Sequence, residues 1–152
     1  MALKPLRKDN VGSDVAYVLG AAAEKGVVVR ILGASGTGKP GDANNTVEVP
    51  TNASGFPVGV LMTDVVSLDL SRFPHLASNH RDETTVGRPV KIMTEGYLYT
   101  NMVSGAPTPG VSVYYTVGGL VTATNTGSVV VGTFRGVKDA DGYIGVNVKV
   151  GV

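Results

Sequence analysis

VSVYYTVGGLVTAT, residues Val111–Thr124, is the stretch of the sequence that decides the fold. Apolar and polar side chains alternate on both sides of the Gly118-Gly119 pair. Alternation with a period of two is typical of a half-buried strand. A Gly-Gly pair accommodates the positive φ angles that a tight hairpin turn requires. The stretch therefore predicts an antiparallel β-hairpin with a two-residue turn.

Short runs rich in Val and Thr recur outside this hairpin and predict further strands. They are Val27–Leu32, Thr46–Val49, Val58–Met62, Val65–Leu70, Pro89–Met93, Tyr97–Val103, Ser128–Phe134 and Tyr143–Val150. The turn residues between them include Glu95-Gly96, Ala106–Gly110, Asn125–Gly127 and Asp139–Gly142. Val and Thr suit a pleated, half-buried surface, and many short strands with turns between them indicate a sandwich or a barrel. We therefore expect a mostly-β fold, a β-sandwich or β-barrel of short antiparallel strands with long Gly/Pro-rich loops.

The length of 152 residues favours one domain, which we place at residues 13–152. Residues 1–12 are polar and basic without hydrophobic periodicity, and predict an extended N-terminal arm. Irregular loops are expected at 33–45, 51–57 and 71–85. The segment 13–26 allows two interpretations: a helix capped by a Ser and a Gly, or a strand followed by a turn at 24–26.

The composition argues against several classes of protein. Thirteen basic and twelve acidic residues leave a formal charge of +1, so the charge balance gives no sign of nucleic-acid binding. The absence of Cys excludes disulfides and thiolate chemistry. No apolar run approaches the roughly 20 residues of a membrane span, and the first ten residues lack the apolar core of a secretory signal. We expect neither nucleic acid nor membrane as a partner.

GASGTGKP, residues 33–40, follows a predicted strand and approaches the phosphate-binding pattern of nucleotide-binding enzymes. That pattern needs a Ser or Thr hydroxyl for Mg²⁺ after the Lys, and a helix whose N-terminus faces the phosphates. Pro40 supplies no hydroxyl and no N–H. The Pro-, Gly- and Asn-rich run that follows does not favour a helix. We interpret the segment as a glycine-rich loop with an exposed Lys39.

No other cluster predicts catalysis, a metal site or a cofactor site. His75 and His80 lie near two carboxylates in a polar loop, a setting more typical of solvated side chains than of a metal site. Asp139–Gly142 resembles the start of a calcium loop, but the twelfth ligand position would be Val148. It is better explained as a hairpin turn. We expect no catalytic residues, no metal and no cofactor.

The tyrosines of the predicted strands and the basic arm are the remaining candidates for binding. Tyr97, Tyr99, Tyr114 and Tyr115 could form an aromatic platform for sugars or bases, although cross-strand packing is their ordinary role. The arm could order on a partner surface through its basic side chains. With no catalytic set left, the residues favour a structural or binding role.

The segment from residue 58 to residue 150 resembles the small β-rich decoration, or cement, proteins of tailed-bacteriophage capsids. The likeness is in GRPVKIMTEGYLYTN, and in GVSVYYTVGGLVTATNTGSVVVGTFRGVKDADGYIGVNVKV with its VGTF strand and closing D-x-D-G hairpin. VGVLMTDVVSLDLSR is also similar to such proteins. The resemblance is a pattern of strands and turns rather than a signature of reactive residues.

This resemblance implies a virion protein, assembled in the host cytoplasm, that binds the outer capsid surface as a homotrimer or homodimer. It would bridge neighbouring major capsid proteins and stabilise the shell. The basic residues expected to contact the capsid or a neighbouring subunit are Lys4, Arg7, Lys8, Lys39, Arg72 and Arg81. The alternative is a non-catalytic carbohydrate-binding β module of a phage tail or surface protein, with exposed tyrosines stacking on sugars.

Overall fold

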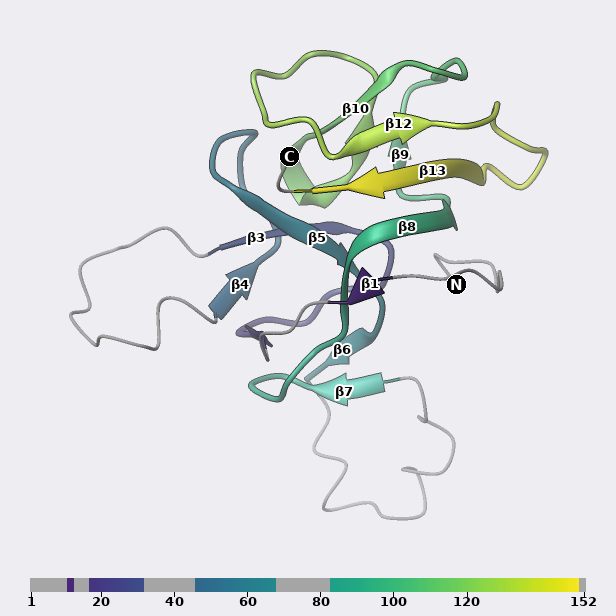
Figure 1. Ribbon diagram of the computed structural model, residues 1–152. Helices are drawn as coiled ribbons and strands as arrows, with labels where there is room; N and C mark the ends of the chain where they lie inside the picture. Colours follow the sequence, from purple (N-terminus) through teal and green to yellow (C-terminus); the bar gives the residue numbers. More distant parts are fainter. Residues whose placement is uncertain (1–10, 13–16, 32–45, 68–82, 151–152) are drawn as a thin grey trace.

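The computed structural model describes residues 11–12, 17–31, 46–67 and 83–150. Within these ranges the protein consists almost entirely of β-strands and connecting turns (Figure 1). The strands are β1 (Val11–Gly12), β2 (Val18–Leu19), β3 (Val28–Ile31), β4 (Thr46–Glu48), β5 (Pro57–Leu61), β6 (Asp64–Val66), β7 (Glu83–Thr85), β8 (Ile92–Thr100), β9 (Val103–Ser104), β10 (Ser112–Tyr115), β11 (Val121–Thr122), β12 (Gly132–Phe134) and β13 (Ile144–Lys149). One short 3₁₀ turn, η1 (Val117–Gly119), joins β10 to β11. The expected mostly-β class is confirmed.

Eleven of the described strands join a single mixed sheet. Its path runs β2-β4-β3-β5-β8-β13-β12-β10-β11-β9, and β1 pairs with β8 beside this path. β6 and β7 form a separate two-stranded ribbon, below the main sheet in Figure 1. Because the path ends at β2 and β9, the ladder formed by the described strands does not close into a barrel.

The strands were expected to be antiparallel, and most described pairs are, but β2–β4, β9–β11 and β6–β7 are parallel. In the first two pairs, one strand of opposite direction intervenes in the sequence. The chain therefore reverses twice and returns in its original direction. The β6–β7 pair is joined by a long connection, as parallel neighbours require. β7 occupies Glu83–Thr85, which were expected to be the last residues of the irregular loop 71–85. These three residues are therefore a strand and not part of a loop.

The buried side chains form two hydrophobic clusters, and β3, β5 and the start of β8 lie between them. The first cluster is Val28, Val60, Met93, Leu98, Val113, Tyr115, Val121, Val131, Phe134, Ile144, Val146 and Val148. The second is Leu19, Val27, Val29, Val47, Val58, Leu61, Val65, Val90 and Ile92. β3, β5 and the start of β8 contribute residues to both clusters, since successive side chains of a strand point to opposite faces. Burial on both faces explains the unbroken apolar run Val27–Val29.

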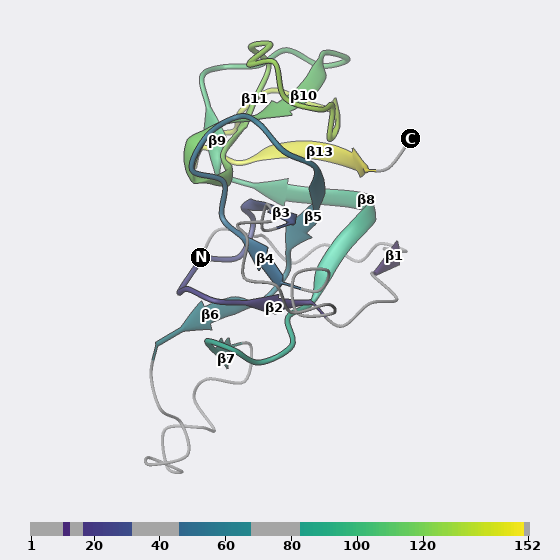
Figure 2. The ribbon, with the colours of Figure 1, turned by 90° about the vertical axis from the view of Figure 1, so that its left-hand side faces the viewer.

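The segment that precedes β8 is hydrogen-bonded through its backbone to residues of β2 and just before it. The N–H of Val90 donates to the carbonyl of Tyr17 at 2.9 Å, and the N–H of Gly87 donates to that of Leu19 at 3.0 Å. The segment preceding β8 thus lies beside β2 while β8 itself pairs with β5. β2, β4, β3, β5 and this segment together surround the second cluster, as Figure 2 shows for β2, β4 and β5 around the lower half of the molecule.

The hairpin predicted at Val111–Thr124 is confirmed, with a longer turn than expected. β10 and β11 pair antiparallel, and Thr116 N–H donates to the Leu120 carbonyl at 3.0 Å. The turn therefore contains three residues, Val117 to Gly119. Both glycines have positive φ, and Gly118 N–H donates to the Pro50 carbonyl at 2.8 Å. Contact with a distant loop stabilises the longer turn.

The structure decides three further expectations about turns. Glu95-Gly96 was expected to be a turn, but β8 continues through it, with Gly96 at a φ of 145°. Residues 17–26 adopt the strand-and-turn form rather than a helix, with β2 followed by a turn at Lys25–Gly26. The Asp139–Gly142 turn is confirmed: Asp139 N–H donates to the Tyr143 carbonyl at 2.8 Å between β12 and β13.

Candidate binding surface

The residues predicted to contact a capsid or a neighbour all lie outside the described part of the structure. This holds for Lys4, Arg7, Lys8, Lys39, Arg72 and Arg81. The glycine-rich segment 33–40 and both histidines, His75 and His80, also lie outside it. These predictions therefore stay predictions, and the candidate surface has to be built from other residues.

The outward side of the β8–β13–β12–β10 ladder gathers side chains that can bind another molecule. Register places Tyr97 opposite Asn147, Asn147 opposite Thr133, and Thr133 opposite Ser112. These side chains share one face because paired residues point to the same side of a sheet. We call this surface the outer face; it also carries Glu95, Tyr99, Tyr114, Arg135, Gly145 and Lys149 by the same alternation.

Three of the four strand tyrosines singled out in the sequence lie on the outer face, and the fourth does not. Tyr97, Tyr99 and Tyr114 are half-buried on it, whereas Tyr115 points inward and is fully buried. The rings of Tyr97 and Tyr99 meet edge to face, with centroids 5.3 Å apart and an interplanar angle of 86°. Edge-to-face contact is a favourable arrangement for aromatic pairs. It also means that the two rings do not form one flat platform.

Gly145 of β13 makes room for this tyrosine pair. A Cβ atom there would overlap the hydroxyl of Tyr97, so the ring lies directly against the β13 backbone. Burial, together with the neighbouring Tyr99 hydroxyl, raises the pKa of Tyr97 to about 12, against an opposing effect of Arg135. The phenol therefore stays neutral near pH 7 and serves as a hydrogen-bonding group.

The chemistry of the outer face suits recognition of a protein surface or a glycan. It combines phenol, amide, hydroxyl and guanidinium groups on a regular ladder. Aromatic residues and Arg are enriched at protein interfaces, and amide and phenol groups also bind sugars. The sequence singled out the tyrosines; it did not single out Thr133, Arg135 or Asn147, because only strand register brings them together.

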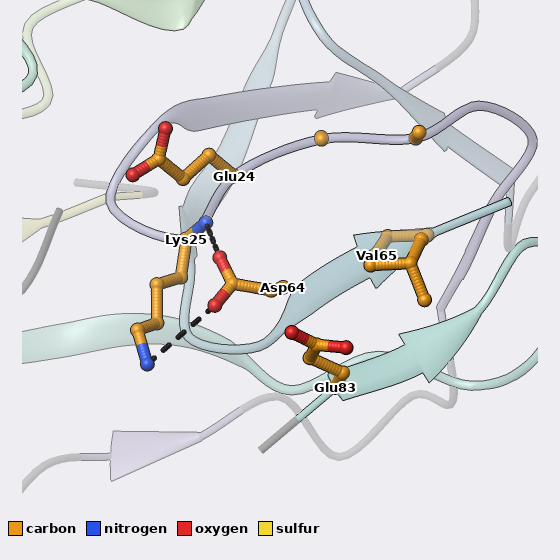
Figure 3. A pocket seen from close by; sticks show the side chains of 8 residues that line it. Glu24, Lys25, Asp64, Val65 and Glu83 are labelled. Atoms are coloured by element: carbon orange, nitrogen blue, oxygen red, sulfur yellow. Dashed lines mark hydrogen bonds and ion pairs between the residues drawn. The ribbon is translucent and has the colours of Figure 1, made fainter. Parts of the chain in front are cut away.

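A second candidate is an open hollow between the turn at Lys25 and the β6–β7 ribbon (Figure 3). Lys25 lies at its edge, and its backbone N–H and Nζ approach the two carboxylate oxygens of Asp64 at 2.7 and 3.6 Å. Glu83 faces the same space, whereas the carboxylate of Glu24 points away from Asp64 in Figure 3. Within the described residues no group of three potential ligands could hold a metal ion. The Lys25–Asp64 contacts tie the turn to β6, which is a structural role.

A buried arginine is the feature that sequence reasoning missed. Arg30 lies on β3 with 8% of its surface exposed. Its Nε donates to Glu48 at 2.8 Å, one terminal nitrogen donates to the Asn52 side chain at 2.6 Å, and the same nitrogen donates to the Ser54 carbonyl. The signal was present, since a charge inside the apolar run Val27–Leu32 must find partners when it is buried.

No helix in the described residues is long and apolar enough to cross a membrane. No protein-family model matches the chain, and no curated protein matches its sequence.

Proposed function

We propose that this protein is a non-catalytic structural component of a bacteriophage virion. It binds the outer surface of the capsid as a homo-oligomer and bridges neighbouring major capsid proteins, which stabilises the shell. The observation that carries the proposal is the outer face, a broad ladder surface of aromatic, amide, hydroxyl and basic groups. Such a surface offers area for contact with another protein rather than a pocket for a small substrate.

The architecture supports a load-bearing role. β8 and β13 pair along six residues of each strand, and β12 extends the same ladder. Separating these strands requires many backbone hydrogen bonds to break together. On a symmetric shell, many weak contacts also reinforce one another, because each additional contact becomes effectively intramolecular.

Binding to purified capsid shells tests the proposal directly. The wild-type protein should co-sediment with shells in a fixed stoichiometry and raise the temperature at which they disrupt. Deleting residues 1–10 or changing Lys39→Glu should weaken this binding, since both remove basic groups. A protein that ignores shells at every concentration tested would refute the proposal.

A matched pair of charge reversals tests the outer face itself. Arg135→Glu places an acidic group on the outer face, whereas Lys138→Glu makes the same change in the exposed β12–β13 turn. We expect Arg135→Glu to weaken shell binding at least about tenfold, as loss of an interface arginine often does. Lys138→Glu should change it less than about twofold. Equal effects of the two variants would remove the outer face from the binding surface.

Carbohydrate binding is the second candidate, and the half-buried Tyr97–Tyr99 pair beside Asn147 is the observation that favours it. The edge-to-face rings leave at most one of them able to stack flat on a sugar. Retention on a polysaccharide column that is lost in Tyr99→Ala, together with no binding to shells, would favour this function over capsid binding.

A further inference from the structure

Two long runs of the sequence carry no charged side chains, and parts of both meet at one end of the described structure. The sequence contains no Asp, Glu, Lys, Arg or His from Gly96 to Phe134, and none from Val49 to Thr63. All of these residues are described in the structure. The runs include β5 and the second half of β8 in the middle of the sheet, and also the loop between β4 and β5 and the strands β9 to β12. The loop lies beside the β10–β11 turn, where the N–H of Gly118 donates to the Pro50 carbonyl, and both are at the upper end of the molecule in Figure 1. We call this region the charge-free end.

Large apolar side chains are exposed on the charge-free end. Of the described residues, those with large exposed apolar side chains are Phe56, Val117, Val129, Val130 and Val137. All except Val137 belong to the two uncharged runs, and Phe56 and Val117 are 54% and 58% exposed. The core of a protein interface is depleted in charged residues and enriched in aromatic ones. The composition of this end is therefore that of an interface rather than of an ordinary solvated surface, which carries many charges.

Buried groups hold the exposed residues in place. The Tyr115 hydroxyl donates to the Gly55 carbonyl at 2.7 Å, next to Phe56. The Arg30 guanidinium donates to the Asn52 side chain and the Ser54 carbonyl of the same loop. The backbone N–H of Tyr115 donates to the Ser128 hydroxyl at 3.1 Å, next to Val129. A loop fixed before binding loses little conformational freedom on association. The apolar residues are thus presented on segments that the fold already orders.

The absence of charge on this end favours a partner surface that is also uncharged. A charged partner surface would lose its hydration against this end and find no opposite charge in return. Two copies of the same end meet without any like-charge repulsion, and symmetric self-association pairs identical patches. We propose that the charge-free end is the surface through which copies of this chain associate with one another. The inference deepens the proposed function and rests on it only for the expectation of an oligomer.

Two exposed valines provide a matched test in the full-length protein. Val117→Lys places a charge on the charge-free end, and Val137→Lys makes the same change at a valine that is 67% exposed in the β12–β13 turn. Sedimentation velocity over a concentration series should show an oligomer for the wild type and for Val137→Lys. Val117→Lys should raise the dissociation constant at least about tenfold, because a charge buried in the interface would lose its hydration. Phe56→Lys should act in the same direction, which covers the case in which Val117→Lys fails to fold.

The outcomes separate this inference from capsid binding. A wild type that stays monomeric at every concentration overturns it, as does equal dissociation by Val117→Lys and Val137→Lys. Unchanged self-association of Val117→Lys and Phe56→Lys with lost shell binding would assign this end to the capsid instead, and also overturns it. If the wild type ignores shells while Val117→Lys becomes monomeric, capsid binding fails and the self-association surface stands.

Discussion

At the scale of single residues, the buried side chains of Arg30 and Tyr115 fix the loop 51–57 by hydrogen bonds. Arg30 is the centre of one such network, since it binds Glu48 on the adjacent strand and three residues of the loop 51–57, Thr51, Asn52 and Ser54. In the described residues no buried side-chain nitrogen or oxygen lacks a hydrogen-bond partner. Removing the Arg30 side chain would take the hydrogen-bond donor from the half-buried Glu48 carboxylate and would release the loop from β3.

Removing the Arg30 side chain should destabilise the protein strongly. Arg30→Met takes the guanidinium donor from the half-buried Glu48 carboxylate and from the Ser54 carbonyl, while the Asn52 side chain keeps its hydrogen bonds from Ser54. The variant should lower the free energy of unfolding by about 2 kcal/mol. Urea denaturation measures this value. The control is Arg135→Met, which changes an exposed arginine and should stay within about 0.5 kcal/mol of the wild type. Similar stabilities of the two variants would show that the buried network is unimportant.

The ionisation of Tyr97 should make stability fall at high pH. Its pKa is about 12 in the folded protein and about 10 in an unfolded chain. Between these values the unfolded state loses the proton while the folded state keeps it, so stability is complete below pH 10 and declines up to about pH 12. Thermal melts at pH 8 and pH 11 should therefore differ less in Tyr97→Phe than in the wild type. Tyr143→Phe also removes one phenol and serves as the control; an equal change in both variants would contradict the assignment.

At the scale of strands, close backbone approach determines which glycines are required. Gly132 on β12 lies opposite Val148 of β13, and a Cβ atom on Gly132 would overlap the carbonyl oxygen of Asn147. The β12–β13 pairing thus depends on the missing side chain. Gly136, just beyond β12, has no atom within 4 Å of its would-be Cβ. The two positions look alike in the sequence and differ only in what the neighbouring strand places beside them.

This difference predicts opposite effects of the same substitution. Gly132→Ala forces the two strands apart and should lower the free energy of unfolding by about 1–3 kcal/mol. Gly136→Ala should be neutral or stabilise by up to about 1 kcal/mol, because it restricts the unfolded chain. Chemical denaturation of both variants makes the comparison. A Gly132→Ala variant as stable as Gly136→Ala would mean that the strands are not packed this closely.

At the scale of the whole molecule, two surfaces of different chemistry divide the binding roles that we propose. The outer face carries Glu95, Arg135 and Lys149 among its tyrosines and amides. The charge-free end carries none. The two surfaces are built from the same strands, since β10 and β12 take part in both, and so their positions are fixed relative to each other. A subunit that self-associates through one surface can therefore present the other to a shell.

The two proposed contacts should respond differently to salt. Salt screens interactions between exposed charges. Raising the salt concentration from about 0.05 to 0.5 M should weaken shell binding, which depends on basic residues. It should change the dissociation constant of self-association less than about twofold, because no charges meet there. Sedimentation at both salt concentrations measures the two affinities, and a tenfold loss of self-association would contradict the assignment of the charge-free end.

The sequence by itself determined the local structure of this protein: the β class, most of the strands and the β10–β11 and β12–β13 hairpins. These properties follow from side-chain alternation and turn residues, which act between near neighbours in the chain. Only the tertiary structure decided that β8 continues through Gly96, that Arg30 is buried, and that Tyr97, Thr133 and Asn147 share one face. Each of these depends on contacts between strands far apart in the sequence, and a local pattern does not specify which distant strand will supply them.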